Sequence, residues 1–141
     1  VLDVNLKSVF TLCQEVLPYM IKNHEGKIIN MSSIAGTLGF ANLSGYVMSK
    51  AAIIGLTKSL AVEFAEKNIQ INALAPGFCK TSYFENFQEN KELYDFTLSR
   101  TPMNRWGESK EIADVCVFLA SSMSNYMTGE VLKVDGGWSA G

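Results

Sequence analysis

The sequence predicts an α/β fold in which a parallel β-sheet carries helices on both faces. Short apolar runs that are typical of strands alternate along the chain with longer segments of helical periodicity. Successive strands that are joined through helices pair in parallel, because the helix returns the chain to the end of the sheet where it began. The 141 residues contain no internal repeat and no sign of a second domain.

The composition excludes several classes of protein. Lys and Arg number 12 against 14 Asp and Glu, which makes the net charge −2, so no positive excess is available to bind nucleic acid. Hydrophobic residues make up 48% of the chain and charged residues 18%, as in globular proteins. No stretch of 18 consecutive apolar residues occurs, so we expect no membrane-spanning helix and no membrane partner.

Cysteine and histidine usage argues against metal chemistry. Cys13, Cys79 and Cys116 are an odd number and lie far apart, which fits neither a disulfide framework nor a metal site. We expect reduced thiols and a cytoplasmic protein. Because His24 is the single histidine, zinc hydrolases and Ser-His-Asp hydrolases have almost no candidate residues in this chain, and no metal is expected.

The first part of the chain is predicted to be a helix followed by a strand. Helical periodicity covers residues 2–23, and we expect Pro18 to bend this helix or to end it early. Residues 24–26 are a stop signal, and residues 27–32 form a short apolar strand. The following segment, 33–44, is rich in Gly, Ser and Asn and is predicted to be a functional loop.

The middle of the chain holds the strongest helical pattern, over residues 46–66. Its first half is apolar nearly all round, so we expect it to be covered on both sides. Residues 69–74 form a second strand. Residues 78–105 are polar and aromatic without clean periodicity, and one or two helical segments are expected within 84–99.

The last part of the chain repeats the helix-strand order. Residues 109–121 form a helix, residues 127–129 a turn and residues 130–134 a third strand, closed by a tight turn at 135–137. Three strands make a small open sheet. In a doubly wound fold, the outer edge of the strand at 27–32 normally pairs with a further strand.

Two side chains in the strongest helix suggest proton transfer. Tyr46 and Lys50 are four residues apart, so they share a helix face. A phenol has a pKa of about 10, and a nearby cation stabilises the phenolate, which would make Tyr46 a general acid for an alkoxide or a general base for an alcohol. Ser33 ends the preceding strand, where α/β sheets present ligand-binding residues, and can hold a carbonyl oxygen. A Tyr and a Lys at this spacing also occur by chance.

Further motifs follow in a specific order. Residues 72–77 read Asn-Ala-Leu-Ala-Pro-Gly, and residues 134–137 read Val-Asp-Gly-Gly. Together with Ser33 and the Tyr-x-x-x-Lys pair, this order resembles the short-chain dehydrogenase/reductase family over essentially the whole chain. The resemblance implies the Rossmann-type, doubly wound parallel sheet, here its C-terminal half with three strands and flanking helices. It also implies hydride transfer between NAD or NADP and a carbonyl or secondary alcohol.

The resemblance assigns four catalytic residues. It implies that Tyr46 is the proton donor and acceptor, that Lys50 assists it and binds the nicotinamide ribose, and that Ser33 orients the substrate. Asn5 matches the helix asparagine that holds a water in the family's proton relay. A polar helix residue or an N-terminal cap is the structural alternative for Asn5.

The resemblance also implies a cofactor-binding set. Pro76 and Gly77 match the turn beneath the nicotinamide, while Cys79 by its backbone and Thr81 by its hydroxyl match the carboxamide contacts, and Tyr46 and Lys50 complete the set. Cys79 is alternatively a small buried residue, with no sign of a reactive thiol. The glycine-rich phosphate loop does not occur in the sequence, so NAD and NADP are not distinguished.

We therefore expect residues 1–141 to be a single partial domain, the catalytic C-terminal part of a Rossmann-fold oxidoreductase without the N-terminal dinucleotide-binding strands. The helices at 2–23 and 46–66 match those through which the family dimerises, so we expect a homodimer or homotetramer. A truncated, non-catalytic oligomerising fragment is an alternative function.

Residues 82–105 match the position of the family's substrate lid. Their aromatic residues are Tyr83, Phe84, Phe87, Tyr94 and Phe96. The segments around 67–72 and 100–108 resemble members that act on sugar acids or polyols, such as gluconate 5-dehydrogenase, and Arg100 and Arg105 are either carboxylate ligands or structural residues. The alternative substrate is a 3-oxoacyl thioester on acyl carrier protein, for which His24 and Lys67 give weak support as basic docking residues.

Overall fold

The main sheet of the computed structural model, which describes residues 1–82 and 84–141, has three strands. They are β1 (Gly26–Met31), β2 (Ile69–Pro76) and β5 (Val131–Val134), and they pair in parallel in the order β1-β2-β5. The three strands lie close to the ranges that the sequence predicts. Their parallel pairing confirms the α/β fold class.

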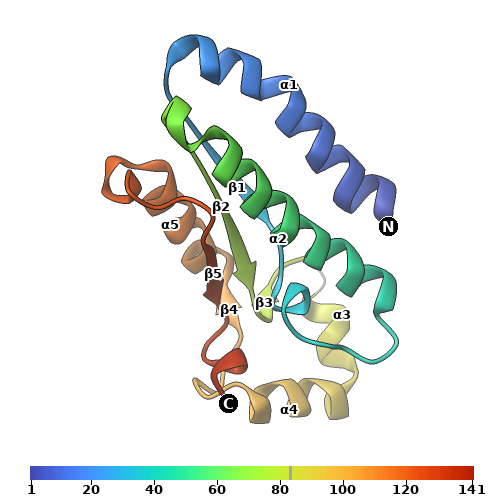
Figure 1. Cartoon of the computed structure of the whole chain (residues 1–141). Helices are drawn as coiled ribbons and strands as arrows, with labels where there is room; N and C mark the ends of the chain where they lie inside the picture. Colours follow the sequence, from blue (N-terminus) through green and yellow to red (C-terminus); the bar gives the residue numbers. More distant parts are fainter. Residues whose placement is uncertain (83) are drawn as a thin grey trace.

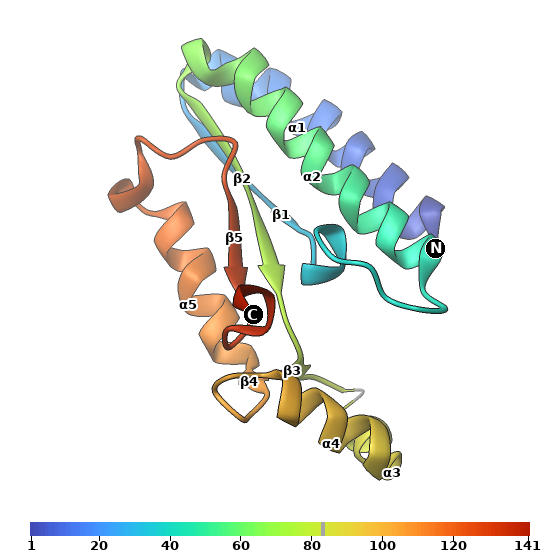
Figure 2. The ribbon, with the colours of Figure 1, turned by 60° about the horizontal axis from the view of Figure 1, so that its bottom comes forward.

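Helices cover both faces of this sheet, as Figures 1 and 2 show. Helices α1 (Ser8–Asn23) and α2 (Ser44–Phe64) lie side by side on one face, and α5 (Ser109–Ala120) lies on the other. A π-helical turn at Asp3–Lys7 leads into α1. None of the described helices combines the length and the apolar character needed to cross a membrane.

Two short helices, α3 (Phe84–Glu89) and α4 (Lys91–Arg100), lie beyond the carboxyl end of β2 (Figure 1). They confirm the helical segments expected within 84–99. On either side of them, β3 (Cys79–Lys80) and β4 (Gly107–Glu108) pair in parallel as a second, two-stranded sheet. The sequence does not predict this pairing, because a strand of two residues is too short to show an alternating pattern.

Helix α1 continues through Pro18 to Asn23, close to the predicted end of the helix at residue 23, so of the two expected effects of this proline the early end does not occur. Leu17 before the proline is buried in the core, and Met20 and Ile21 after it pack against the same core, so packing holds the helix on both sides of Pro18. The helix ends at the predicted stop signal, where His24 adopts a left-handed conformation with φ of 55°. Such a residue closes the last turn of a helix.

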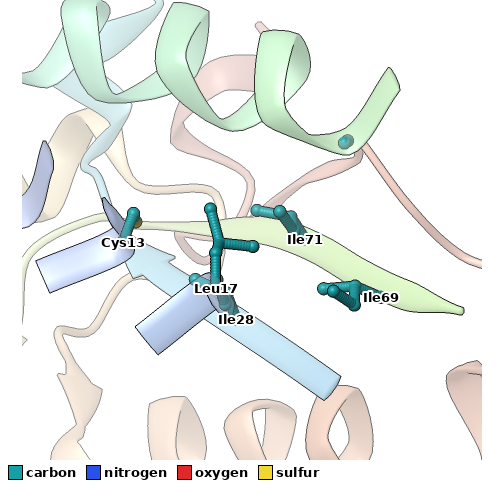
Figure 3. Close-up of a cluster of buried hydrophobic side chains, with 6 residues drawn as sticks. Cys13, Leu17, Ile28, Ile69 and Ile71 are labelled. Carbon is teal, nitrogen blue, oxygen red and sulfur yellow. The ribbon is translucent and has the colours of Figure 1, made fainter. Parts of the chain in front are cut away.

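The core lies between α1, α2 and the strands (Figure 3). Cys13 and Leu17 from α1 meet Ile28 of β1 and Ile69 and Ile71 of β2. Helix α2 also contributes Ala61 to this core, which is 1% exposed.

The opposite side of α2 is open, since Met48 is 53% and Val62 84% exposed. The prediction that this helix is covered on both sides is therefore wrong for the chain by itself.

A buried polar chain ties β1 to both helices. The Asn30 side chain donates from Nδ2 to Oγ1 of Thr57 on α2 over 2.9 Å, and the Cys13 thiol donates to Asn30 Oδ1 over 3.8 Å. All three side chains are buried. A buried amide without a partner is costly, so this chain holds β1, and the loop that follows it, at a defined position relative to α2.

Replacing Thr57 by valine tests this arrangement. Thr57→Val keeps the side-chain shape but leaves the Asn30 amide without its acceptor, and we expect the free energy of unfolding to fall by about 1–3 kcal/mol. Urea denaturation of the two proteins measures the change. The control is Ser59→Ala on the exposed side of α2, for which we expect a change within about 0.5 kcal/mol. Equal effects of the two substitutions would contradict the role of the buried chain.

Candidate active site

A hollow of about 580 Å³ opens at the carboxyl ends of β1 and β2, and we call it the main hollow. Ligand sites of α/β proteins lie at this end of the strands. Seven residues that the sequence predicts for the site line it: Ser33, Tyr46, Lys50, Pro76, Gly77, Cys79 and Thr81. Residues from separate parts of the chain are thus brought to one cavity.

Strand register brings two of these segments together. Met31 of β1 pairs with Leu74 of β2, and the Ser32 amide donates to the Leu74 carbonyl over 2.7 Å. Ser33 follows immediately and begins a short 3₁₀ turn, its hydroxyl oxygen accepting from the Ala35 amide over 3.2 Å. The Ser33 hydroxyl is therefore held at the rim of the sheet, beside the end of β2.

Tyr46 and Lys50 lie one turn apart near the start of α2, as the spacing predicts. The Lys50 ammonium lies 5.7 Å from the centre of the Tyr46 ring and donates to the Met31 carbonyl over 3.0 Å. Burial lowers the pKa of Lys50, because leaving water penalises the charged form. The lysine thus links the helix to the end of β1 while its side chain lines the main hollow.

Ser32 and Gly36 hold α2 in place, and sequence reasoning assigns them no role. Ser32 is buried, and its hydroxyl donates to the Lys50 carbonyl over 2.9 Å. A Cβ on Gly36 would lie 2.8 Å from the same carbonyl oxygen, so only glycine permits this approach. In the sequence, the feature that could have identified Ser32 is its position directly before Ser33, where the strand ends and the chain turns toward the helix.

The end of β2 carries the predicted cofactor residues. Gly77 packs against Asp135, whose Cβ would lie 2.7 Å from an added Cβ, so glycine is required at this contact. Burial, and the nearby charge of Glu111, raise the pKa of the Cys79 thiol, which keeps it neutral and agrees with the expectation of an unreactive cysteine.

Asn5 does not line the main hollow. It lines a second hollow of about 460 Å³ beside α1, together with Asn30, Met31 and Lys50. Met31 and Lys50 line both hollows, so Lys50 lies between Asn5 and the main site. Asn5 is inside the π-helical turn and not at its start, so its interpretation as an N-terminal cap is wrong.

Neither predicted carboxylate ligand lines the main hollow. Arg105 forms a two-bonded ion pair with Glu111, at 2.6 and 2.8 Å, and the guanidinium of Arg100 lies 5.3 Å from the Trp138 ring centre. The Arg105 hydrogen bond is the largest of the contacts that lower the pKa of Glu111 to about 2. The structure thus supports the structural interpretation of both arginines.

The basic residues considered for carrier-protein docking lie far from the main hollow. His24 and Lys67 precede the amino ends of β1 and β2, whereas the hollow is at the carboxyl ends. Strand β1 has six residues, which corresponds to about 20 Å. A carrier protein bound at His24 and Lys67 would be separated from the site by the length of the sheet.

The predicted lid contributes Phe87 of α3 to the main hollow, and Trp106, the residue directly after the lid, also lines it. Sequence reasoning places Phe87 in the lid but does not single out Trp106 as a wall. Tyr83, also expected in the lid, lies outside the described residues.

Comparison with known proteins agrees with the fold and the motifs. A family model described as enoyl-(acyl carrier protein) reductase matches residues 1–139. The 3-oxoacyl-acyl-carrier-protein reductase of Thermotoga maritima is 47% identical over 137 residues, which cover 97% of this chain and 55% of that protein. The 2-dehydro-3-deoxy-D-gluconate 5-dehydrogenase of Bacillus subtilis is 43% identical over 138 residues, covering 98% of this chain and 54% of that protein.

Solved structures show the same backbone. A gluconate 5-dehydrogenase from Burkholderia cenocepacia, in complex with NADP and tartrate, is 35% identical and superposes with a TM-score of 0.96 over 100% of this chain and 55% of its own. A 4-hydroxyisoleucine dehydrogenase complexed with NADH is 36% identical, with a TM-score of 0.96 over 100% of this chain and 58% of its own.

The chain belongs to the short-chain dehydrogenase/reductase family. Its fold is the Rossmann-like fold of the solved members. The chain spans about half the length of the curated relatives it matches, 55% and 54% for the two named above.

The burial of Lys50 leads to a prediction about pH. A lowered pKa means that Lys50 loses its proton at a lower pH than the ordinary lysine value of about 10.4. We expect the ¹³Cε resonance of Lys50, in protein labelled with ¹³C-lysine, to titrate below that value. The Lys50→Arg variant identifies the resonance by its loss. A midpoint at or above the ordinary value would contradict the burial of this amine.

Proposed function

We propose that the protein of which this chain forms all or part is an NAD(P)-dependent oxidoreductase. It would transfer a hydride between the nicotinamide and a carbonyl or secondary alcohol. The observation that carries the proposal is the convergence of Ser33, Tyr46 and Lys50 on one hollow with the residues at the end of β2. Membership of the family supports it.

The chain's own residues handle the substrate oxygen and its proton. In the reductive direction, the Tyr46 hydroxyl gives a proton to the oxygen as the carbonyl becomes an alcohol, and in the oxidative direction the phenolate takes it back. The Ser33 hydroxyl donates a hydrogen bond to the same oxygen and orients it. The Lys50 ammonium lies 5.7 Å from the centre of the Tyr46 ring, and we propose that it assists Tyr46 in this proton transfer. Asn5, across Lys50 in the second hollow, is proposed to hold a water that continues the proton path.

The residues at the end of β2 fit a nicotinamide. Pro76 at the end of β2, Gly77, Cys79 and Thr81 follow one another along one part of the lining of the hollow. We propose that these four, with Tyr46 and Lys50, hold the nicotinamide and its ribose. The bound cofactor supplies or accepts the hydride. Relatives crystallised with NADP or NADH support either form.

Two substrate classes are supported by relatives. A sugar acid or polyol is supported by the gluconate-type dehydrogenases, and a 3-oxoacyl thioester on acyl carrier protein is supported by the Thermotoga reductase. Both contain the carbonyl or secondary alcohol that Ser33 and Tyr46 would hold. Residues 82–105, which include α3 and α4, are proposed as the lid over this substrate.

Assembly through α1 and α2 is also proposed, as a homodimer or homotetramer. Large apolar side chains are exposed on both helices: Phe10, Leu12 and Tyr19 on α1, and Met48 and Val62 on α2. Burial of such side chains between two copies would be favourable. A cytoplasmic location stays a prediction from the cysteine content.

Substitution of Tyr46 tests the catalytic proposal. We expect Tyr46→Phe to lower kcat/KM for carbonyl reduction by roughly 10²–10⁴-fold, because the proton donor is removed. Tyr19→Phe on the exposed face of α1 is the matched control and leaves activity unchanged. Substantial activity in Tyr46→Phe would overturn the assignment.

The cofactor proposal is tested by fluorescence titration of the chain with NADH and NADPH. We expect saturable binding that weakens in Lys50→Ala. If the folded chain shows no binding up to about 1 mM, near the weak end of specific affinities, it is not an enzyme by itself. The alternative, an oligomerising fragment without catalysis, would then account for it.

A further inference from the structure

We propose that the main hollow selects a carbonyl compound or alcohol whose substituent is apolar and uncharged, and that Phe87 is a specificity-determining residue. The inference rests on the proposed function and identifies the substrate class of that same site. Two observations support it: the apolar side chains that line the main hollow, and the positions of Arg100 and Arg105 outside that lining.

Much of the lining of the main hollow is aromatic or aliphatic, and we call this part of it the aromatic wall. Apart from Met31 and Ile34 beside the end of β1, its large members are Phe40, Leu43, Phe78, Phe87, Trp106 and Ile112. The rings support one another, since Phe87 lies 4.8 Å and Phe78 lies 5.3 Å from Trp106 between ring centres. Rings at these distances pack as an apolar core does, so the wall offers a surface that binds by excluding water.

Trp106 presents no polar atom to a ligand. Its indole Nε1 donates to Thr97 Oγ1 of α4 over 2.8 Å, and both residues are buried. The single hydrogen-bond donor of the indole is thus used inside the protein. What remains toward the hollow is the apolar ring.

The two arginines that could recognise a carboxylate are engaged elsewhere. Arg105 is paired with Glu111, which also accepts from the Glu108 amide over 2.8 Å and so caps helix α5. Turning Arg105 toward the hollow would break the ion pair and leave the Glu111 charge without its partner. Arg100 lies over Trp138, outside the lining of the main hollow.

Among the described lining residues, Lys50 is the one with a formal positive charge at neutral pH. Its ammonium donates to the Met31 carbonyl and is assigned above to the cofactor and to Tyr46. A carboxylate placed against the aromatic wall would lose its hydration without gaining a cation there, which is strongly unfavourable.

Ser33 and Tyr46 come from other elements than Phe87 and Trp106. Ser33 follows β1 and Tyr46 starts α2, whereas Phe87 is on α3 and Trp106 precedes β4. A substrate with its oxygen at Ser33 and Tyr46 would therefore extend its substituent toward the lid aromatics. This orientation places the apolar part of the molecule, and not its reacting group, against Phe87.

A pair of ketones that differ in charge tests the inference. Methyl 4-oxopentanoate and 4-oxopentanoate share their carbon skeleton up to the ester methyl, and the second carries a carboxylate. We titrate each into the chain and follow tryptophan fluorescence, because Trp106 lines the hollow. We expect the ester to bind at least about tenfold more tightly than the acid.

Substitutions locate the effect. Phe87→Ala is expected to weaken binding of the ester by about tenfold, and Phe87→Leu to restore most of it, because the wall needs an apolar side chain of that size. Tyr126→Ala, at a fully exposed aromatic residue outside the lining of the main hollow, is the control and leaves binding unchanged. Arg100→Gln and Arg105→Gln are expected to leave binding of both ketones unchanged.

Three results would overturn the inference: tighter or equal binding of the acid, loss of acid binding in either arginine variant, or no ester binding to a chain whose circular dichroism shows it folded. The titrations need neither cofactor nor turnover. The Tyr46→Phe assay therefore judges the proposed function independently of this inference.

Discussion

The parallel pairing of β1 with β2 is the constraint on which the site depends. It sets Met31 opposite Leu74, and the Ser32 amide extends the ladder by one bond to the Leu74 carbonyl. A slip of one residue would turn every side chain of β1 to the other face. Ser33 would then leave the rim of the hollow and Ile28 would leave the core. The core therefore specifies the register, and the register places Ser33 beside the end of β2.

Besides the bond from Asn30 to Thr57, helix α2 is joined to the end of this strand pair by two polar contacts at Lys50. The Lys50 side chain reaches the Met31 carbonyl, and the Lys50 carbonyl accepts from the Ser32 hydroxyl. Because a helix is rigid over a single turn, fixing Lys50 also fixes Tyr46 one turn earlier. The close approach at Gly36 permits both contacts. The positions of Tyr46 and Lys50 thus follow from packing within the chain that involves no ligand.

The sequence predicts what is local and periodic. The three main strands, the three long helices and the convergence of Ser33, Tyr46 and Lys50 follow from apolar periodicity, spacing and the family motifs. Of the two effects expected of Pro18, a bend or an early end of the first helix, the early end does not occur, because tertiary burial outweighs the local effect of one proline. The aromatic wall was not predicted as a unit, since Phe40 and Trp106 are distant in sequence and meet only through the fold. The pairing of Arg105 with Glu111 was not predicted either, because the sequence does not show whether an arginine side chain points into the hollow or toward helix α5.

The fold alone does not decide the substrate in this family. Relatives named for sugar acids and for acyl thioesters match nearly all of this chain at similar identity, so the shared sheet and Tyr-x-x-x-Lys pair serve both. The discrimination must come from side chains that the catalytic geometry leaves unconstrained. Here those side chains belong to α3 and the segment before β4, where Phe87 and Trp106 are packed and Arg105 is held by Glu111. The proposed charge preference therefore depends on the ion pair at the start of α5, where Glu111 holds Arg105.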